Sequence, residues 1–410
     1  MPGSYSRREW IRLAASSAVG VALAAQPTQA ETRTPPSQPS IEPNTIKRRG
    51  TGFRGYDPQR TSPGFTLFAP MSGSVVYLVD LQGNVEHTWQ MPYPSQYGYL
   101  TERGTLFYNG VLPTGRFAGQ PTALAGGVVL EANWNGNVLW ELRQPDHHHD
   151  GRLLSNGNVL LLCATELPDD VATQVVGGVP ETEVNGKMLG DYLVEMTTDG
   201  QTVWEWRTWE HLDPATYPYT MPSNNRADWT WGNAVHELAD GDILLSLRHL
   251  STIIRINRQT DDIDWELGPP PLSGAHGVNP LANGNYLIFD NGPYRVDQGT
   301  LAPVNFAPFS RVIEVDPSTN DIVWTYTDPA RASLWSPLIS NPQRLPNGNT
   351  LINEGLFGRL FEVTPDGDTV WEYVNPYFGP DTAPPKAQTN SIFRAYRYTA
   401  DDIDRARAAR

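Results

Sequence analysis

The chain has 410 residues, a formal net charge of -15 at pH 7, 36 glycines, 36 prolines and 13 tryptophans. The acidic balance argues against nucleic acid as a partner, and the frequent turn residues favour many short strands over long helices. The single cysteine, Cys163, excludes an intrachain disulfide. Its place in the apolar run NVLLLCATEL predicts a buried side chain rather than a nucleophile.

The N-terminus has the pattern of an export signal. The stretch SRREWIRLAASSAVGVALAAQPTQA contains paired arginines, an apolar run and a small-residue end at Ala30. This pattern predicts a twin-arginine signal peptide over residues 1–30 and a periplasmic or secreted mature protein. The apolar run is short for a permanent span, although an uncleaved anchor is the alternative. Residues 31–50 are rich in Pro, Thr and Ser and predict a disordered linker.

A phrase that ends in tryptophan recurs six times within residues 51–400, the expected folded domain. The copies are LQGNVEHTW, NWNGNVLW, TTDGQTVW, QTDDIDW, STNDIVW and TPDGDTVW, which end at Trp89, Trp140, Trp204, Trp265, Trp324 and Trp371. A short alternating strand precedes each copy. Asp-Gly and Asn-Gly accept the positive φ of tight hairpin turns, so most copies predict a hairpin.

A second phrase, seen in LLSNGNVLLL, LADGDILLS and LANGNYLIF, raises the count to three or four strands per repeat. All-β repeats of this size are typical of propeller blades, which bury their faces only when stacked radially. The sequence therefore predicts an all-β, six-bladed β-propeller, with each repeated tryptophan mostly buried between blades. Residues 401–410 are expected to form a C-terminal tail.

The second phrase also identifies candidate site residues. Five positions before its leucine stand His149, Asn233, His276 and Ser340, so four blades are expected to contribute side chains to one layer at a channel mouth. Two of the four are histidines, in a chain with only eight. Arg248 can share this mouth only if the chain turns back after Asn233. The run DHHHD is not expected to bind a metal, because consecutive histidines do not face one point.

Several segments resemble the aryl-sulfate sulfotransferase family, most closely DWTWGNAV, LLSLRHLSTIIRINRQTDDIDWELG, GAHGVNPLANGNYLIFDNG and SRVIEVD. Members of that family are exported six-bladed propellers that move a sulfuryl group between phenols without a nucleotide donor. The resemblance covers most of residues 50–400. It implies that His276 accepts the sulfuryl group, that Arg248 is the family's arginine, and that His149, or its neighbour His148, is a further catalytic histidine.

The sequence departs from the family in two places. Trp231 stands where the family has another histidine, and the disulfide of classical members cannot form. The resemblance still implies an aryl sulfate and a phenolic acceptor as small-molecule partners, with no cofactor. Trp229 and Trp231 are candidates for stacking on the aryl ring, and Asn233 or His236 for replacing the missing donor.

These residue types suit sulfuryl transfer. A neutral imidazole can attack sulfur, a guanidinium matches sulfate oxygens in bidentate fashion, and a second histidine can protonate the departing phenolate. An exported polysaccharide lyase is the alternative. In it a histidine of the same set, or a tyrosine such as Tyr97, Tyr99 or Tyr286, would abstract a proton beside a uronate carboxylate that arginine neutralises. A non-catalytic ligand-binding propeller is a third possibility.

Overall fold

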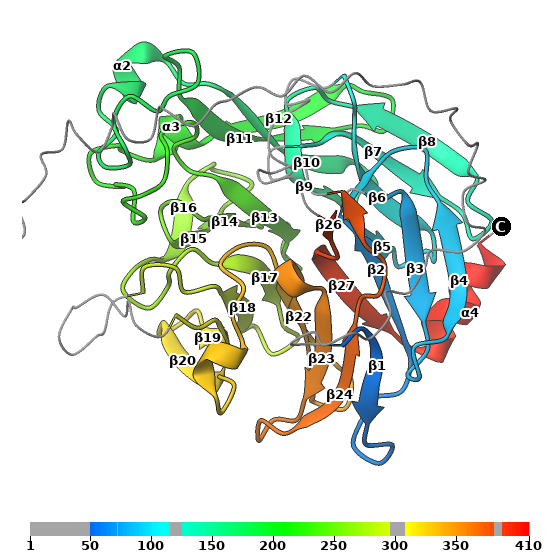
Figure 1. Ribbon diagram of the computed structural model, residues 1–410. Helices are drawn as coiled ribbons and strands as arrows, with labels where there is room; N and C mark the ends of the chain where they lie inside the picture. The colour runs from blue at the N-terminus through cyan, green and yellow to red at the C-terminus, as the bar shows by residue number, and fades with distance from the viewer. Residues whose placement is uncertain (1–49, 72, 115–124, 296–307, 381–387, 410) are drawn as a thin grey trace, which may run out of the picture. The chain divides into compact units, whose positions relative to one another are not determined.

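The structure is a computed structural model that describes residues 50–409 except residue 72 and segments 115–124, 296–307 and 381–387. The expected signal peptide, and all of the expected linker except Gly50, lie outside the described residues. The strands of the described residues form six antiparallel sheets around a central axis (Figure 1), which confirms the predicted six-bladed β-propeller. No helix in the described ranges is long and apolar enough to cross a membrane.

Four blades consist of four consecutive strands each. In each blade the strands are given from the axis outward. The first two blades contain β5 (Ser95–Leu100), β6 (Leu106–Val111), β7 (Gly127–Ala132) and β8 (Val138–Arg143), and then β9 (His147–Leu153), β10 (Val159–Glu166), β11 (Leu189–Met196) and β12 (Thr202–Arg207). The next two contain β13 (Gly232–Glu237), β14 (Ile243–Leu247), β15 (Thr252–Ile256) and β16 (Ile263–Leu267), and then β17 (His276–Pro280), β18 (Tyr286–Asp290), β19 (Arg311–Asp316) and β20 (Asp321–Tyr326).

The other two blades join the beginning and the end of the described chain. The N-terminal blade has β27 (Ile392–Tyr398) as its innermost strand, followed by β2 (Phe65–Pro70), β3 (Val75–Val79) and β4 (Val85–Gln90). The C-terminal blade contains β21 (Asn341–Arg344), β22 (Thr350–Glu354), β23 (Arg359–Val363) and β24 (Thr369–Val374), and β1 (Gly52–Tyr56) pairs with its outer edge. Main-chain pairing at both seams closes the ring and satisfies strand edges that would otherwise be exposed.

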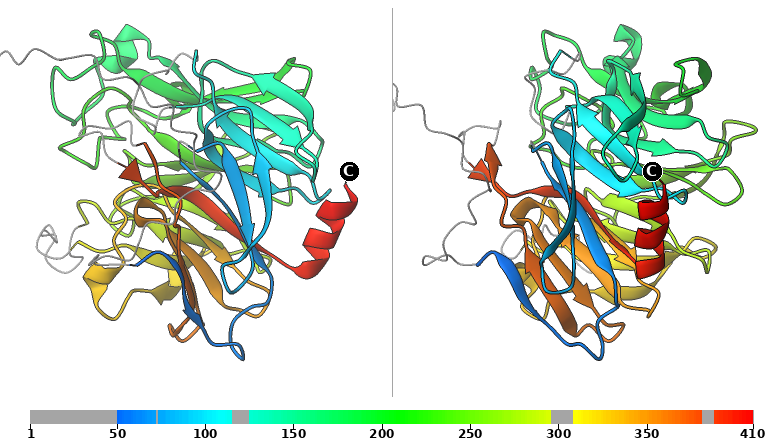
Figure 2. Two further views of the ribbon diagram at one scale, coloured as in Figure 1. Left: turned by 45° about the vertical axis from the view of Figure 1, so that its right-hand side comes forward. Right: turned by 90° about the vertical axis from the view of Figure 1, so that its right-hand side faces the viewer.

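Short elements complete the described chain. They are α2 (Asp169–Ala172), α3 (Thr208–His211), the 3-10 turns η2 (Arg331–Ser333) and η3 (Gly355–Phe357), the small sheet of β25 (Gly379–Pro380) and β26 (Gln388–Thr389), and α4 (Ala400–Ala408). Residues 401–408, expected as a tail, instead belong to α4, which lies beside the N-terminal blade (Figure 2). Thr399 caps this helix with a capping box, and Ile403 and Ala406 are buried in a core cluster with Trp89.

The repeated tryptophans lie on the fourth strand of each blade. Trp89 and Trp371 are buried and the other four are half-buried, so all six are mostly shielded from solvent, as predicted, although to different depths. Five indole Nε1–H groups donate to a turn of the next blade; for example, Trp204 donates to Asp261 at 2.8 Å and Trp371 donates to the Leu81 carbonyl at 2.8 Å. The tryptophans therefore join neighbouring blades by hydrogen bonds as well as by packing.

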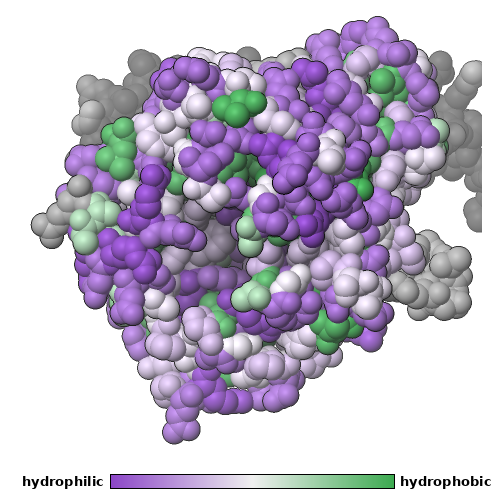
Figure 3. Space-filling model, turned by 180° about the vertical axis from the view of Figure 1, so that it is seen from behind, coloured by the Kyte–Doolittle hydropathy of each residue, from purple (hydrophilic) through white to green (hydrophobic). Residues whose placement is uncertain are grey.

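The six innermost strands, β5, β9, β13, β17, β21 and β27, surround the axis (Figure 1). They run in one direction along it, so their first residues gather at one end and their last residues at the other. We call the end marked by His149 and His276 the first mouth, and the end marked by Leu100 and Tyr398 the second mouth. Seen from behind in Figure 3, the propeller is hollowed near its middle.

Candidate active site

Antiparallel pairing brings Arg248 to the first mouth. The chain turns back between β13 and β14, which pairs Gly232 with Leu247, and the Arg248 backbone N–H donates to the Trp231 carbonyl at 3.1 Å. The same pairing of β17 with β18 places Asn291, the residue after β18, beside His276. The side chains at one mouth therefore come from two places: the first residues of an innermost strand and the residues that follow its hairpin partner.

Bulges and left-handed backbone conformations set the directions of these side chains. The pairing register skips Asn233 on β13 and Gly277 on β17, so both inner strands bulge where they begin. Bulges of this kind redirect side chains and are common next to active sites. Gly277 has φ 55°, and a Cβ there would lie 2.8 Å from Cα of Asn341, so only glycine fits. His149 and Trp231 also adopt left-handed conformations, with φ 50° and 48°.

Asn291 determines which nitrogen of His276 carries the proton. The Asn291 amide NH2 donates to the carbonyls of Ser336 at 2.7 Å and Ile339 at 2.9 Å, so its Oδ1 must be the atom that lies 2.9 Å from His276 Nδ1. The Gly274 carbonyl lies 3.3 Å from the same nitrogen. Two acceptors at Nδ1 assign the proton to Nδ1 and the lone pair to Nε2.

The surroundings also keep His276 neutral. Burial and the positive charge of Arg248 lower the pKa of His276 to about 3, although the hydrogen bond to Asn291 opposes the shift. At neutral pH the ring is therefore an uncharged imidazole with its lone pair on Nε2. That is the state in which histidine acts as a nucleophile.

Arg248 is a half-buried cation that no carboxylate of the described residues pairs with. Its Nη2 lies 3.5 Å from the Pro337 carbonyl, and its buried Nε has no hydrogen-bond partner among those residues. Burial lowers the pKa of Arg248 to about 10, so it stays charged at neutral pH. A guanidinium with a donor to spare has the geometry to bind the oxygens of a sulfate or a similar anion.

His149 lies in a chain of three buried polar groups. Asp191 Oδ1 lies 2.9 Å from His148 Nε2, and His148 Nδ1 lies 2.6 Å from His149 Nδ1. Burial, with the charges of His148, His276 and Arg248, holds the pKa of His149 well below its usual range. The charge of Arg248 lowers the pKa of both His149 and His276, so the guanidinium lies near both rings.

Trp231 forms an aromatic wall between two histidines. Its ring centroid lies 5.6 Å from that of His149 and 4.8 Å from that of His249, and the side chain is half-buried. His249 was not among the residues expected in the site. Its Nδ1 lies 2.8 Å from the Asp228 carbonyl, so Nδ1 donates and the lone pair is on Nε2. Burial and the charge of Arg248 hold the pKa of His249 well below its usual range.

The other expected binding residues do not face the site in the same way. Trp229 has no exposed surface, lies in a hydrophobic core cluster and donates its indole N–H to the Tyr217 carbonyl at 3.1 Å. Asn233 donates one N–H of its amide to the Ala275 carbonyl at 2.9 Å, which leaves its second N–H and its oxygen for another partner. His236 lines a cavity at the second mouth. Neither Trp229 nor His236 is therefore placed to donate a hydrogen bond to an anion beside Arg248.

The tyrosines suggested for a lyase do not suit proton abstraction. Tyr97 and Tyr286 are buried, and Tyr99 accepts a hydrogen bond from the Leu153 backbone at 3.0 Å. Burial raises the pKa of all three, that of Tyr99 to about 12. A tyrosine that acts as a base at neutral pH needs a lowered pKa, not a raised one.

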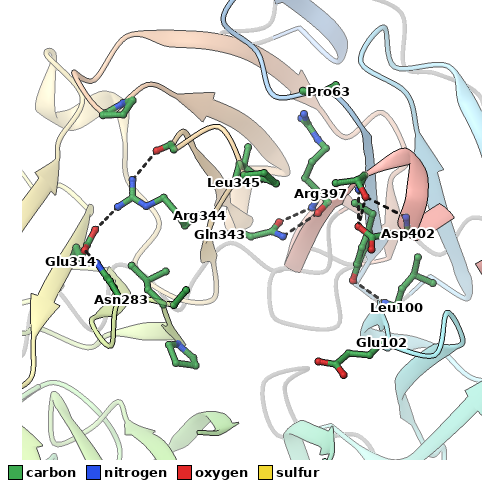
Figure 4. A pocket seen from close by; sticks show the side chains of 18 of the residues that line it. Pro63, Leu100, Glu102, Asn283, Glu314, Gln343, Arg344, Leu345, Arg397 and Asp402 are labelled. Atoms are coloured by element: carbon green, nitrogen blue, oxygen red, sulfur yellow. Dashed lines mark hydrogen bonds and ion pairs between the residues drawn. The ribbon is translucent and has the colours of Figure 1, made fainter. Parts of the chain in front are cut away.

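A cavity of about 960 Å³ opens at the second mouth (Figure 4). Two of its charged groups balance each other: Arg344 pairs with Glu314 at 2.6 Å, and Asn283 donates to the same carboxylate at 3.0 Å. The size of this cavity does not make it the better candidate, because the uncompensated charge and the assigned histidine tautomers lie at the first mouth.

The three consecutive histidines have separate partners. His147 Nδ1 accepts the Gly127 backbone N–H at 3.2 Å, while His148 faces Asp191 and His149 faces Trp231. Among the residues that the structure describes, no group of three His, Cys, Asp or Glu side chains could hold a metal ion. Cys163 is fully buried, and burial raises the pKa of its thiol well above the usual value, as its apolar surroundings predict.

Three residues of the site were missed by the sequence interpretation: Asp191, His249 and Asn291. The motif SLRHL contains His249 and FDNG contains Asn291, so the family-like segments held a signal for both. Asp191 has no such local signal, because it stands on a different strand from the histidine that it contacts.

Comparisons with known proteins bear on the fold and on the family of this chain. No curated protein matches the chain at a significant level. A crystal structure of a protein of unknown function from Bacteroides caccae is 12% identical, covers 82% of this chain and 99% of its own, and has a TM-score of 0.50. Virginiamycin B lyase from Staphylococcus aureus is 11% identical, with 80% and 85% covered and a TM-score of 0.43. Identities this low bear on the fold alone.

The family model for arylsulfotransferase (ASST) matches residues 57–274, more than half of the chain. The matched range contains His149 and Arg248 and ends just before His276, so the assignment of a role to His276 depends on its geometry. The resemblance seen in the sequence is thereby confirmed, and this chain belongs to the arylsulfotransferase family.

Proposed function

We propose that this protein transfers a sulfuryl group from an aryl sulfate to a phenolic acceptor through His276. The observation that carries the proposal is the pairing of a neutral imidazole, whose Nδ1 is bound to Asn291, with Arg248, which has no carboxylate partner among the described residues. Arg248 binds the sulfate oxygens, and the Nε2 lone pair of His276 faces the sulfur.

In the first half-reaction Nε2 of His276 attacks sulfur as the sulfur–oxygen bond to the aryl group breaks. The phenoxide leaves with the bonding electron pair and takes a proton from His149, and a nitrogen–sulfur bond remains on His276. In the second half-reaction the acceptor phenol gives its proton to His149, its oxygen attacks sulfur, and the nitrogen–sulfur bond breaks. Such transfer needs in-line positioning and charge stabilisation more than it needs strong acids or bases.

Trp231 holds the aryl ring in this proposal. It is half-buried at the first mouth and lies against His149 and His249, so a substrate ring that stacks on it would lie next to the proton donor. Trp231 supplies no donor where the family has a histidine. His249, whose Nε2 is unprotonated, can accept a proton but does not replace a donor either, which predicts slow turnover.

The proposal includes export. The paired arginines and the small-residue end at Ala30 support passage through the twin-arginine route and cleavage before Glu31. Intact-mass measurement of protein from the cell envelope should find a chain that starts at Glu31. A chain with the N-terminal segment retained would indicate an anchor.

The test of the activity uses 4-nitrophenyl sulfate as donor and phenol as acceptor. Release of 4-nitrophenol should depend on the acceptor, and brief incubation with donor alone should add the mass of one sulfuryl group to His276. Arg248→Lys should lose most of the activity, because a point charge does not replace a planar fork. Transfer without any sulfo-adduct in wild type, or robust turnover in His276→Ala, would contradict the covalent route.

A further inference from the structure

We propose that Asp191 and His148 form a proton relay behind His149, which lets His149 exchange a proton with the phenol oxygen without itself becoming an imidazolium. This inference rests on the proposed function. It concerns where the proton is stored between the two half-reactions. In it Asp191 and His148 act through His149 and do not touch the substrate.

The three groups lie in line and are buried. Asp191 on β11 places Oδ1 2.9 Å from His148 Nε2, and His148 places Nδ1 2.6 Å from His149 Nδ1 on the same strand, β9. None of the three side chains is more than slightly exposed. A ring-to-ring contact between two Nδ1 atoms at this distance requires one proton between them, which either ring can own.

The negative charge of the relay is held at Asp191. Its second oxygen, Oδ2, accepts hydrogen bonds from the Thr230 hydroxyl and the Gly232 backbone N–H. Burial and the charge of Asp191 raise the pKa of the neighbouring Asp228 well above its usual value, so Asp228 is the more readily protonated carboxyl of the two. The carboxylate that can stabilise an imidazolium therefore contacts His148.

His149 is a poor place for the same positive charge. Among the described residues no carboxylate contacts its ring, and burial and the charges of His148, His276 and Arg248 lower its pKa. A neutral imidazole alone is a weak acid toward a departing phenoxide. A proton on His148 overcomes this difficulty, since the charge then lies against Asp191.

The loaded relay has protons on both nitrogens of His148. The Nε2–H side of the His148 imidazolium forms an ion pair with Asp191, Nδ1–H donates to Nδ1 of His149, and His149 is neutral with its own proton on Nε2. When the sulfur–oxygen bond breaks, the Nε2 proton of His149 moves to the phenoxide and the Nδ1 proton of His148 moves to His149. Both histidines are then neutral, and the phenol departs.

The second half-reaction reverses these movements. The acceptor phenol passes its proton to Nε2 of His149, and the Nδ1 proton of His149 returns to His148. The acceptor oxygen forms its bond to sulfur, and His276 recovers its lone pair. The relay gives up one proton in the first half-reaction and regains one in the second, so a complete cycle takes no proton from solvent.

The test compares two donors with different leaving groups. 4-Nitrophenoxide leaves without protonation, whereas phenoxide needs a proton, so a lost relay should affect phenyl sulfate selectively. Asp191→Asn should lower kcat/KM for phenyl sulfate by about 100-fold, the usual contribution of general acid catalysis, and change that for 4-nitrophenyl sulfate by only a few-fold. Asp228→Asn is the matched control: it changes an equally buried carboxyl with a raised pKa that is not part of the chain from Asp191 to His149, and should keep the wild-type ratio between the donors.

A second measurement needs no variant. Rates of wild type with phenyl sulfate in mixtures of light and heavy water should report two protons in motion, and rates with 4-nitrophenyl sulfate should report none. Equal losses for both donors in Asp191→Asn, or a one-proton response in wild type, would overturn the relay while leaving sulfuryl transfer intact. If wild type transfers from neither donor, the proposed function fails and the relay fails with it.

Discussion

The two mouths of the propeller differ in how their buried charges are balanced. At the second mouth Arg344 pairs with Glu314 at 2.6 Å and lies over the Trp324 ring, and inside the channel Arg394 pairs with Asp150 at 2.8 Å. At the first mouth Arg248 has a carbonyl at 3.5 Å and no carboxylate among the described residues. A half-buried charge without a partner is unfavourable, so an anion bound at Arg248 would remove a cost that Arg344 and Arg394 do not have.

The histidines near the two mouths also differ in their hydrogen bonds and in their charged neighbours. His236 lies on the half of β13 near the second mouth, with Nδ1 3.4 Å from the Glu237 carbonyl, while His276 at the first mouth has two acceptors that assign its tautomer. Burial lowers the pKa of both to about 3, so the pKa does not distinguish them. What distinguishes them is the neighbouring unpaired cation, which only the first mouth provides.

The largest effect is expected from removing the nucleophile. His276→Ala should lower sulfuryl transfer by about 1000-fold or more, as loss of a covalent catalytic group usually does, and should eliminate the sulfo-adduct. His236→Ala, the same change at the second mouth, should retain both. Steady-state rates with 4-nitrophenyl sulfate and intact-mass spectra measure the two variants, and equal losses in both would remove the distinction between the mouths.

Replacing Arg394 and Arg248 should separate activity from stability. Arg394→Leu leaves Asp150 buried without its main partner and should lower the free energy of unfolding by about 3–5 kcal/mol. Arg248→Leu removes an unpaired charge, so the free energy of unfolding should stay equal or rise while transfer falls by about 100-fold or more. Urea unfolding and initial rates test both. A large loss of stability in Arg248→Leu would show that the guanidinium has a protein partner after all.

The neutral histidines should make the fold sensitive to acid. The pKa of His276 is about 3 in the folded state and about 6.5 in the unfolded chain, so below pH 6.5 only the unfolded state gains a proton there. Stability should therefore fall as pH drops from about 6.5 toward 3, with at most about 1.4 kcal/mol per pH unit from each such histidine. Urea unfolding of His276→Asn at several pH values should show a shallower loss than wild type, and parallel curves would contradict a depressed pKa.

The smallest effect is expected at the aromatic wall. Trp231→Ala should raise KM for aryl sulfates by about tenfold, since aromatic pairs contribute roughly 1 kcal/mol beyond buried area. Inhibition by inorganic sulfate, which binds through Arg248 alone, should be unchanged. A parallel loss of sulfate inhibition would mean that Trp231 supports Arg248 rather than the aryl ring.

Much of the fold could be read from local patterns. The turn-and-tryptophan phrase repeats along the chain, and strand alternation and positive-φ turns are properties of neighbouring residues, so six blades follow from the sequence alone. The depth of each tryptophan did not follow, because Trp204 is half-buried and hydrogen-bonded to Asp261 of the next blade. Helix α4 was missed because nine residues with few apolar positions resemble a tail until Ile403 and Ala406 meet the core.

The candidate site, like the fold, could be predicted only in part from the sequence. The shared repeat position of His149 and His276 was visible in the sequence by itself, as were the family-like segments that contain Arg248. Only the tertiary structure decided that Asn291 assigns the tautomer of His276, that Asp191 stands behind His148, and that Arg248 lacks a carboxylate among the described residues. The physical reason is that strand and turn signals are local, whereas tautomer, charge balance and protonation depend on contacts between strands and loops that the sequence keeps far apart.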